Sequence, residues 1–286
     1  MTTLFDFFAR LSATARSTID EAIGQGLDTQ NKGGLDEKGG SLYDPVTAVD
    51  RGVERALRAM IEAEFPADGI IGEEYGAVRE GARRIWSLDP IDGTRQLVCG
   101  LPAWTVLVGL VEDGVPVAGM IDTPRLDELV IGDASGTVLH GTSQRLRTSG
   151  CTDLAEARLS TTDPYLFDAD AAPRFERLRQ GAMLTRYGLD GHAYARIAHG
   201  TLDLVAETGL KPHDWQALVP VVRGAGGVIG NWRGGDDMSG GDVLAAATRE
   251  LFDEAVRVLA GSEWRFFNSA TMSAQTRPRA FSNTVR

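Results

Sequence analysis

The spacing of apolar residues in the first half of the chain predicts two helices followed by a sheet. Apolar side chains recur every three or four positions over residues 3–24 and 47–64, which is the pattern of amphipathic helices. Between them, residues 25–42 are rich in glycine and polar side chains and predict a loop or a loose hairpin. Short apolar runs bounded by glycine, proline or charged residues predict strands, and they cover residues 70–72, 84–88, 104–111, 115–121, 129–131 and 136–139.

Predicted strands and helices alternate in the second half of the chain. The strands are expected at 157–161, 182–187 and 202–206, and the helices at 170–180, 190–199, 214–225 and 249–260. This mixture predicts layered sheets and helices in an α+β arrangement, divided near residue 150. One unit covers residues 1–150 and a second covers 151–261, while residues 262–286 form a polar tail without periodicity, as is typical of disordered segments.

Length and charge narrow the classes of function. The 286 residues suffice for one large domain or two closely packed ones, and a net charge of −11 argues against non-specific nucleic-acid binding, which needs a basic surface. No apolar run approaches the roughly 18 residues that a membrane span needs. Cys99 and Cys151 are not in a metal-binding spacing, and charged residues interrupt any N-terminal signal sequence. These features predict a cytoplasmic protein without nucleic-acid or membrane partners.

Acidic residues at the ends of predicted elements are the candidate chemistry of the chain. They are Asp50, Glu73, the pair Asp89 and Asp92, and Asp214. Taken singly, each has a structural explanation, because Asp-Pro and Asp-Gly are common turn dipeptides and aspartate is favoured in the first turn of a helix. Together, converging carboxylates would repel one another unless a divalent cation lay between them. Mg²⁺ prefers such oxygen ligands, so the set predicts a metal site for phosphate chemistry.

Four sequence motifs carry a family resemblance. They are Asp44-Pro-Val-Thr-Ala-Val-Asp50, Ile71-Gly-Glu-Glu74, Trp86-Ser-Leu-Asp-Pro-Ile-Asp-Gly-Thr94, and His213-Asp-Trp215 followed by Ala225-Gly-Gly227. Over roughly residues 3–260 the chain resembles the inositol-monophosphatase-like, Mg²⁺-dependent phosphomonoesterases, although His213 replaces the usual aromatic residue before the aspartate. The resemblance implies an α/β/α/β/α sandwich, a homodimer, and two or three Mg²⁺ ions in each site.

The resemblance also implies the metal ligands. Glu73, Asp89 and the carbonyl oxygen of Ile91 would hold one Mg²⁺ ion, and Asp89, Asp92 and Asp214 would hold a second. In two-metal sites the ions activate a water molecule and stabilise the leaving oxygen.

The same motifs imply catalytic and phosphate-binding roles. Glu73 and Thr94 would orient and deprotonate the attacking water, with Asp50 supporting Thr94 from behind. The backbone amides of Gly93 and Thr94 would receive the phosphate.

The second half of the chain resembles the histidinol-phosphatase branch of this family. The similar residues are Asp190, Leu210-Lys-Pro-His-Asp214 and Ala217-Leu-Val-Pro-Val-Val222. Histidinol phosphate carries an ammonium and an imidazole group, with which carboxylates at Asp190 and Glu207 could pair. His192 is expected to be a further polar substrate contact, and zinc binding by His192 with His199 is a less favoured alternative. Asp190 could instead be a helix cap, and Glu207 is expected to touch substrate in both branches of the family.

Three other functions stay open at this stage. Residues 95–99, Arg-Gln-Leu-Val-Cys, differ from both the histidinol and the inositol branches, so inositol 1-phosphate remains an alternative substrate. 3′-Phosphoadenosine 5′-phosphate is less favoured, because the chain shows no extra basic cluster for a second phosphate. A non-catalytic regulator of the same fold is the alternative from another class of protein.

Overall fold

A computed structural model describes residues 3–25, 29–31, 45–142 and 144–261. The tail predicted over 262–286 and most of the 25–42 segment lie outside these ranges. At the ends of that segment, β1 (Thr29–Asn31) pairs antiparallel with β2 (Pro45–Thr47).

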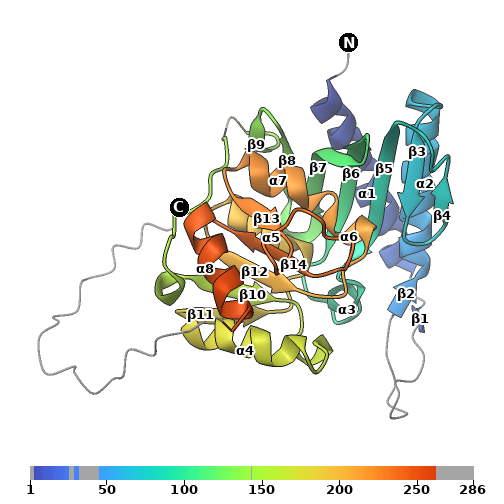
Figure 1. The fold of residues 1–286 in the computed structure, drawn as a ribbon. Coiled ribbons are helices and arrows are strands. Elements are labelled where there is room, and N and C mark those ends of the chain that lie inside the picture. The colour runs from blue at the N-terminus through green and yellow to red at the C-terminus, as the bar shows by residue number, and fades with distance from the viewer. Residues whose placement is uncertain (1–2, 26–28, 32–44, 143, 262–286) are drawn as a thin grey trace, which may run out of the picture.

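The described elements form five layers, as Figure 1 shows. The first layer contains α1 (Leu4–Gln25) and α2 (Ala48–Glu64), which lie on one face of a seven-stranded sheet. The middle layer contains α5 (Gly191–Ala198), α6 (Pro212–Trp215) and α7 (Leu218–Gly224), followed by a five-stranded sheet. The helices α4 (Ala171–Gly181) and α8 (Arg249–Leu259) cover the outer face of this five-stranded sheet. The predicted layered α+β fold is confirmed.

The seven-stranded sheet is built from the first half of the chain, in the order β4-β3-β5-β6-β7-β8-β9. All neighbours are antiparallel except β3 and β5, which are parallel. Its strands are β3 (Gly69–Gly72), β4 (Gly76–Val78), β5 (Arg84–Asp92), β6 (Thr105–Glu112), β7 (Val115–Thr123), β8 (Glu128–Asp133) and β9 (Gly136–Leu139).

After β5 comes the short helix α3 (Thr94–Val98), and three-residue 3₁₀ helices follow at η1 (Pro124–Leu126), η2 (Leu154–Glu156) and η3 (Pro164–Leu166).

The five-stranded sheet has the order β11-β10-β12-β14-β13; the edge strand β11 and its neighbours β10 and β12 are parallel, and the remaining pairs are antiparallel. Its strands are β10 (Arg158–Thr161), β11 (Leu184–Tyr187), β12 (Leu204–Glu207), β13 (Val228–Gly230) and β14 (Val243–Ala246). The last two were not predicted, because one has only three residues and the other contains two alanines, which favour strands weakly. The sheets thus come from separate stretches of chain, although a division into two domains stays a prediction.

The single helix predicted over 214–225 is two helices in the structure. It starts earlier, at Pro212, and α6 ends at Trp215 before α7 begins at Leu218. The cause is Pro220, which has no N–H to donate to the carbonyl four residues earlier, at Gln216. The intervening backbone keeps helical dihedral angles, so α6 and α7 remain close to continuous.

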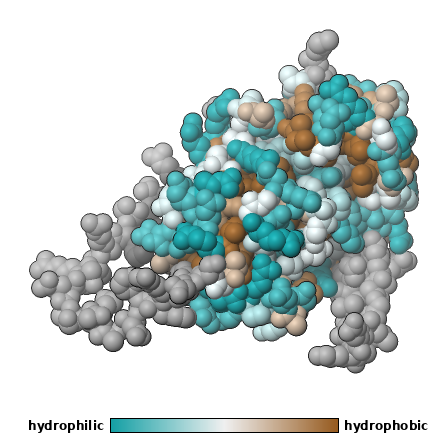
Figure 2. Space-filling view, viewed as in Figure 1, coloured by the Kyte–Doolittle hydropathy of each residue, from teal (hydrophilic) through white to brown (hydrophobic). Residues whose placement is uncertain are grey.

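Three apolar cores hold these layers together. The first lies between α1, α2 and the seven-stranded sheet, where Phe7 and Phe8 pack edge-on against the fully buried Trp86. The second lies between the sheets around α5 and α7, and the third beneath α4 and α8. Figure 2 shows a mainly hydrophilic surface on this face, with hydrophobic residues in separate small groups. Among the helices of the described ranges, none combines the length and apolarity that crossing a bilayer requires.

Candidate functional site

One cavity of 280 Å³ collects the predicted site residues from both sheets. Every predicted residue except Asp50 and His192 lines it: Glu73, Asp89, Ile91, Asp92, Gly93, Thr94, Asp190, Glu207 and Asp214. These residues come from the ends of β5 and β12, from the segment after β3, and from the starts of α3, α5 and α6. Residues more than a hundred positions apart in sequence are therefore brought to one place.

A β-bulge in β5 makes Asp89 and Asp92 face the same cavity. We predicted that this strand ends before Asp89, whereas β5 continues to Asp92. Asp89 pairs with Leu107 of β6 and Asp92 pairs with Thr105, so three steps along β5 match two along β6. In a regular strand, residues three apart point to opposite faces, and the one extra residue returns Asp92 to the face of Asp89. Pro90, which has no N–H for the ladder, lies inside the bulge.

The two aspartates are buried among other carboxylates. Asp89 is 3% exposed, and burial together with the nearby charges of Glu73 and Asp92 raises its pKa well above the usual value. Burial and the nearby charges of Asp190 and Asp214 raise the pKa of Asp92 in the same way. Both carboxylates would therefore be stabilised in their ionised form by a positive charge placed in the cavity.

The donor set of this cavity fits a hard divalent cation such as Mg²⁺. Its donors are carboxylate and carbonyl oxygens, which Mg²⁺ prefers to nitrogen or sulfur, and the raised pKa values of the aspartates mark a shortage of positive charge. In the part of the chain that the structure describes, no three His, Cys, Asp or Glu side chains are already gathered as a metal-binding group.

Asp214 accepts a hydrogen bond at the N-terminus of α6 and also lines the cavity. The backbone N–H of Lys211 donates to Asp214 Oδ2 at 2.6 Å, and His213 Nε2 lies 3.4 Å from Asp214 Oδ1. The two sequence interpretations of this residue, as a helix cap and as a candidate ligand, are therefore compatible.

Thr94 connects Asp50 to the cavity. Thr94 Oγ1 lies 3.2 Å from Asp50 Oδ1 and 3.0 Å from the carbonyl oxygen of Ile91. Asp50 is 1% exposed on α2 and lies behind Thr94, outside the cavity lining. Gly93, just before α3, has a φ of 86°, a left-handed conformation that glycine adopts without strain.

Asp190 and Glu207 line the cavity from the side of the five-stranded sheet. Oδ2 of Asp190 is buried without a hydrogen-bond partner among the described residues, and burial raises the pKa of this carboxyl to about 6. Glu207 Oε1 accepts hydrogen bonds from the Thr162 backbone N–H at 3.0 Å and hydroxyl at 2.6 Å, and burial raises its pKa to about 7. Tyr194 Oη lies 3.4 Å from the other oxygen of Glu207.

His192 does not line this cavity. Its side chain is 6% exposed, and its Nδ1 lies 3.1 Å from Thr123 Oγ1 on β7. Burial, followed by the charges of Arg196 and His199, lowers its pKa to about 4. The residue lies on a buried face of α5, between the sheets, so its position does not support the predicted substrate contact.

Several further residues line the cavity and were not predicted as site residues, among them Arg95, Thr162 and Lys211. Thr162 had a usable signal, because it follows a predicted strand just as Glu207 follows another. The carboxyl ends of parallel neighbours such as β10 and β12 meet at one edge of a sheet. Arg95 directly follows one quoted motif and Lys211 lies within another, Leu210–Asp214, but nothing in the sequence marked either basic side chain as part of the cavity lining.

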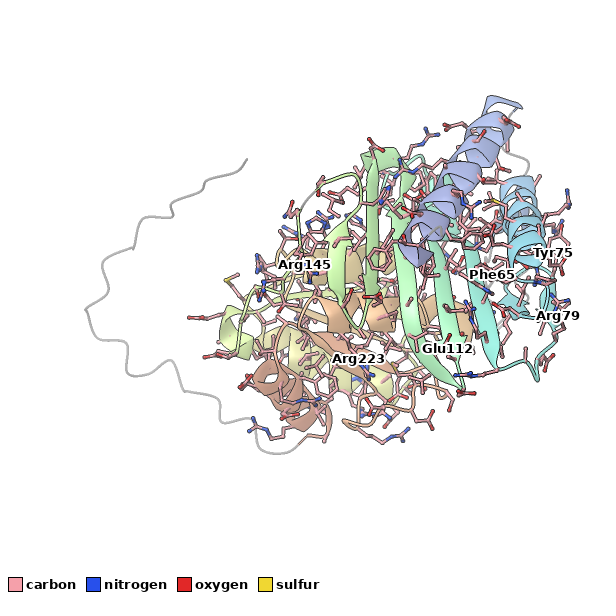
Figure 3. All side chains as sticks on the ribbon, turned by 90° about the horizontal axis from the view of Figure 1, so that it is seen from above. Phe65, Tyr75, Arg79, Glu112, Arg145 and Arg223 are labelled. Atoms are coloured by element: carbon pink, nitrogen blue, oxygen red, sulfur yellow. The ribbon has the colours of Figure 1, made fainter. Side chains whose placement is uncertain are left out.

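A larger cavity of 520 Å³ lies elsewhere, beside β9 and the end of α7. Arg145, Arg147 and Arg223 line it, and Figure 3 shows Arg145 and Arg223 among its side chains. Its one lining carboxylate, Asp133, already accepts two hydrogen bonds from Ser135. We place the candidate site in the smaller cavity because the buried carboxyls with raised pKa values are there.

Comparisons with known proteins agree with this geometry. The chain is 42% identical over 193 residues to the bifunctional phosphatase IMPL2, chloroplastic, of Arabidopsis thaliana, covering 66% of this chain and 55% of that protein. It therefore spans little more than half the length of that relative. It is 30% identical over 220 residues to a histidinol-phosphatase of Chlorobaculum parvum, covering 77% of this chain and 85% of the relative.

A solved structure and a family model extend the comparison to the whole fold. An inositol monophosphatase from Zymomonas mobilis superposes with a TM-score of 0.74 at 34% identity, covering 90% of this chain and 99% of that one. The sequence model of the inositol monophosphatase family matches residues 1–263. Enzymes of this family depend in general on Mg²⁺. The chain therefore belongs to the inositol monophosphatase family.

Proposed function

We propose that this protein is a Mg²⁺-dependent phosphomonoesterase whose substrate is L-histidinol phosphate. The observation that carries the substrate is the pair Asp190 and Glu207, two buried carboxyls of the cavity that are not among the predicted metal ligands. Asp190 Oδ2 has no hydrogen-bond partner among the described residues, and the pKa of each carboxyl is raised by burial. A substrate with an ammonium and an imidazole group would give Asp190 Oδ2 a donor and place positive charge beside Glu207, whereas inositol phosphate offers only hydroxyl groups.

Glu73, Asp89, the Ile91 carbonyl, Asp92 and Asp214 would hold two or three Mg²⁺ ions. Bound Mg²⁺ supplies charge neutralisation for the phosphate and lowers the pKa of water at the site. Arg95 and Lys211 add positive charge at the lining of the cavity, where a phosphate dianion would enter.

The protein's own groups can handle the proton of the attacking water. Thr94 can donate its hydroxyl proton to Asp50 Oδ1, 3.2 Å away, and so present an oxygen lone pair to the water. Glu73 can then accept a proton from the same water as general base. The amides of Gly93 and Thr94 would orient the phosphate.

The relatives support both the favoured and the alternative substrate. Proteins named histidinol-phosphatase and a protein named inositol-1-monophosphatase, from Mesorhizobium japonicum at 32% identity, match the chain at similar levels. Identity therefore does not discriminate between them, and the proposal for histidinol phosphate is supported by the buried, unpartnered Oδ2 of Asp190. A cytoplasmic location also stays a prediction, because one relative is a chloroplast protein.

Phosphate release from a substrate panel tests the proposal. The panel contains histidinol phosphate, inositol 1-phosphate, 3′-phosphoadenosine 5′-phosphate and glycerol 2-phosphate, each with Mg²⁺ and with EDTA. We expect the highest kcat/KM on histidinol phosphate and no release in EDTA. Equal or better turnover of inositol 1-phosphate would refute the substrate, and unchanged activity of an Asp92→Asn variant would refute the metal site.

A further inference from the structure

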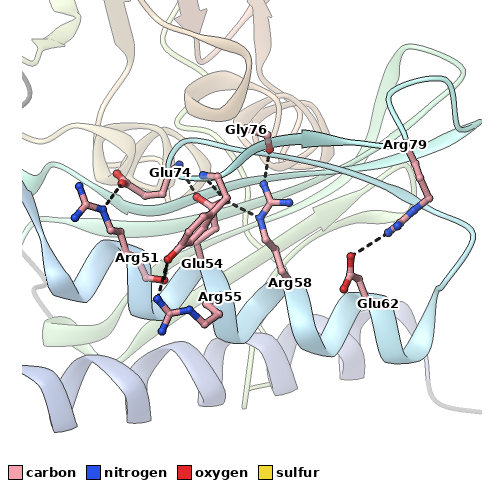
Figure 4. Close-up of polar contacts among 9 residues, drawn as sticks. Arg51, Glu54, Arg55, Arg58, Glu62, Glu74, Gly76 and Arg79 are labelled. Atoms are coloured by element: carbon pink, nitrogen blue, oxygen red, sulfur yellow. Dashed lines mark hydrogen bonds and ion pairs between the residues drawn. The ribbon is translucent and has the colours of Figure 1, made fainter.

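A buried carboxylate lies directly beneath the turn that carries Glu73. Glu54 on α2 is fully buried, and its Oε2 accepts a hydrogen bond from the Glu74 backbone N–H at 2.7 Å. Its Oε1 accepts one from the Tyr75 backbone N–H at 3.2 Å and another from Arg58 Nε at 2.7 Å, as Figure 4 shows in part. A carboxylate is costly to bury, so it persists here because these donors satisfy it.

The backbone on both sides of Glu73 is held by these contacts. The Glu73 N–H donates to the carbonyl of Leu88 on β5 at 3.2 Å, and the next N–H, that of Glu74, donates to Glu54. A Cβ atom on Gly72 would lie 2.1 Å from Glu54 Oε1, which is far too close. The glycine of the Gly72-Glu-Glu74 motif therefore leaves the space that the Glu54 carboxylate occupies.

Basic side chains from successive turns of α2 complete this contact. Arg58 also donates to the carbonyl of Gly76, Arg51 Nε lies 3.5 Å from Glu74 Oε2, and Arg55 donates to the Tyr75 hydroxyl at 2.8 Å. The turn over residues 73–76 is thus bound along one face of α2.

We propose that Glu54 is a positioning residue, which fixes the turn over residues 73–76 and so directs the Glu73 carboxylate into the cavity. This role rests on the proposed function, because Glu73 is there both a Mg²⁺ ligand and the general base. Glu54 itself lines no part of the cavity and touches no substrate. It acts through the backbone, and hydrogen-bonded groups behind a metal ligand commonly change metal affinity or activity by about 10- to 100-fold when they are altered.

The test compares Glu54→Gln with the wild-type full chain. The amide keeps the shape of the side chain, but its NH₂ group must face a backbone N–H or Arg58, and the pairing of Arg58 with a negative charge is lost. We expect faster hydrogen exchange at the amides of Glu74 and Tyr75. We also expect Mg²⁺ binding, measured by calorimetry, and the Mg²⁺ concentration for half-maximal activity to weaken by about tenfold. At saturating Mg²⁺, kcat should fall while KM for the phosphate monoester changes little.

Glu62→Gln is the matched control, since Glu62 lies on the same helix, is half exposed and pairs with Arg79 at 3.3 Å, away from the turn. It should behave as wild type in every assay. Arg58→Lys is the second variant: it keeps a cation beside Glu54, and it should shift exchange and Mg²⁺ binding in the same direction but less. If Glu54→Gln does not fold, Arg58→Lys decides the question.

A folded Glu54→Gln protein with wild-type exchange at residues 73–76 and Mg²⁺ binding within twofold of wild type would overturn the positioning role. Loss of thermal stability alone, with Mg²⁺ binding and kcat unchanged, would also overturn it, since it would show a merely structural contact. Failure of the proposed function looks different, because the wild-type protein itself would then release no phosphate with Mg²⁺. Hydrogen exchange would still report in that case whether Glu54 holds the turn.

Discussion

Asp190 is held in a backbone conformation that few residues other than glycine adopt. Its φ is 47° and its ψ is −139°, and such residues cost on the order of 1–3 kcal/mol and occur often at functional sites. The next residue, Gly191, donates its N–H to Asp92 Oδ2, and a Cβ there would lie 2.5 Å from that oxygen. Asp190, the residue proposed to select the substrate, is therefore linked to the predicted metal ligand Asp92 through the backbone of Gly191.

Asp190→Asn should reduce selectivity without abolishing catalysis. The amide fits the same space and tolerates positive φ, but it cannot pair ionically with a substrate cation. Because a hydrogen bond to a charged group contributes about 1.5–3 kcal/mol, kcat/KM for histidinol phosphate should fall roughly 10- to 100-fold. Activity on glycerol 2-phosphate, which carries no cation, serves as the control and should stay within a few-fold. Equal losses on both substrates would count against substrate recognition by Asp190.

His192 predicts a distinct dependence of stability on pH. Burial lowers its pKa to about 4, so the folded protein keeps it neutral while the unfolded chain takes up a proton below about 6.5. Its contribution to stability is therefore complete above about pH 6.5 and is lost as pH falls to about 4, by at most about 3 kcal/mol. Glu207 and Asp190 affect stability in the opposite direction. Because their pKa values are raised in the folded state, the folded protein takes up their protons at a higher pH than the unfolded chain, and this favours folding as the pH falls.

A comparison of variants isolates this histidine. Urea unfolding of wild type and His192→Gln between pH 7 and pH 4.5 should show a smaller loss of stability on acidification in the variant. His140→Gln, at an exposed position, is the control and should follow wild type. Parallel curves for wild type and His192→Gln would contradict the expectation.

At the scale of elements, glycines let the α6–α7 segment lie directly on the seven-stranded sheet. A Cβ on Gly119 of β7 would lie 2.3 Å from the Ala217 carbonyl oxygen, and one on Gly109 of β6 would lie 2.9 Å from the Ala217 nitrogen. These are backbone atoms, which cannot rotate away as a side chain can. The α6–α7 segment, which carries Asp214, can therefore pack this closely against the sheet only because these two positions are glycine.

Gly119→Ala and Gly52→Ala should change stability in opposite directions. Gly119→Ala would push the backbone of Ala217 away from β7 in a packed core. Overpacking of this kind typically lowers the free energy of unfolding by about 1–3 kcal/mol. The second lies within α2 with its nearest neighbour, Thr18 Cγ2, at 3.5 Å, so alanine should stabilise the helix by up to about 1 kcal/mol. Urea unfolding of both proteins measures these changes. A Gly119→Ala protein as stable as wild type would show that the contact between β7 and Ala217 can accommodate a methyl group.

Most elements could be predicted because their residues repeat with a clear period. The 3.6-residue stripes of α1, α2 and α8 and the apolar runs of β5 to β8 are local signals, and the structure confirms them. The bulge at Pro90 could not be predicted, because it depends on how β5 aligns with β6. The side of α5 that His192 faces is likewise determined by tertiary packing against β7 rather than by local sequence.

At the scale of the molecule, exposed apolar side chains gather beside the cavity. They are Val98 and Leu101 near α3, Tyr165 and Leu166 in η3, and Tyr187 on the edge strand β11. These segments are neighbours: Gly188, after β11, donates to the Thr162 carbonyl, and its Cβ position lies 3.0 Å from Gln96 of α3. Such a patch is typical of a protein–protein interface, and it supports the predicted homodimer.

Sedimentation analysis should find about twice the 30.7 kDa mass of one chain at micromolar concentration. A double variant, Tyr165→Asp with Tyr187→Asp, should be monomeric, because two charges would be buried unpaired at the interface. Val115→Asp, at an exposed position of the other sheet, is the control and should remain dimeric. A monomeric wild type would exclude the homodimer.

The division of the carboxylates between the two sheets has a consequence for folding. Asp89 and Asp92 belong to the first sheet and Glu207 belongs to the second, whereas Asp190 and Asp214 lie at the starts of helices between them. Each sheet can gain its strand pairing before the other docks, but the cavity exists only afterwards. During refolding, catalytic activity should therefore return later than the circular-dichroism signal of the sheets, and Mg²⁺ should stabilise the docked state without speeding the formation of either sheet.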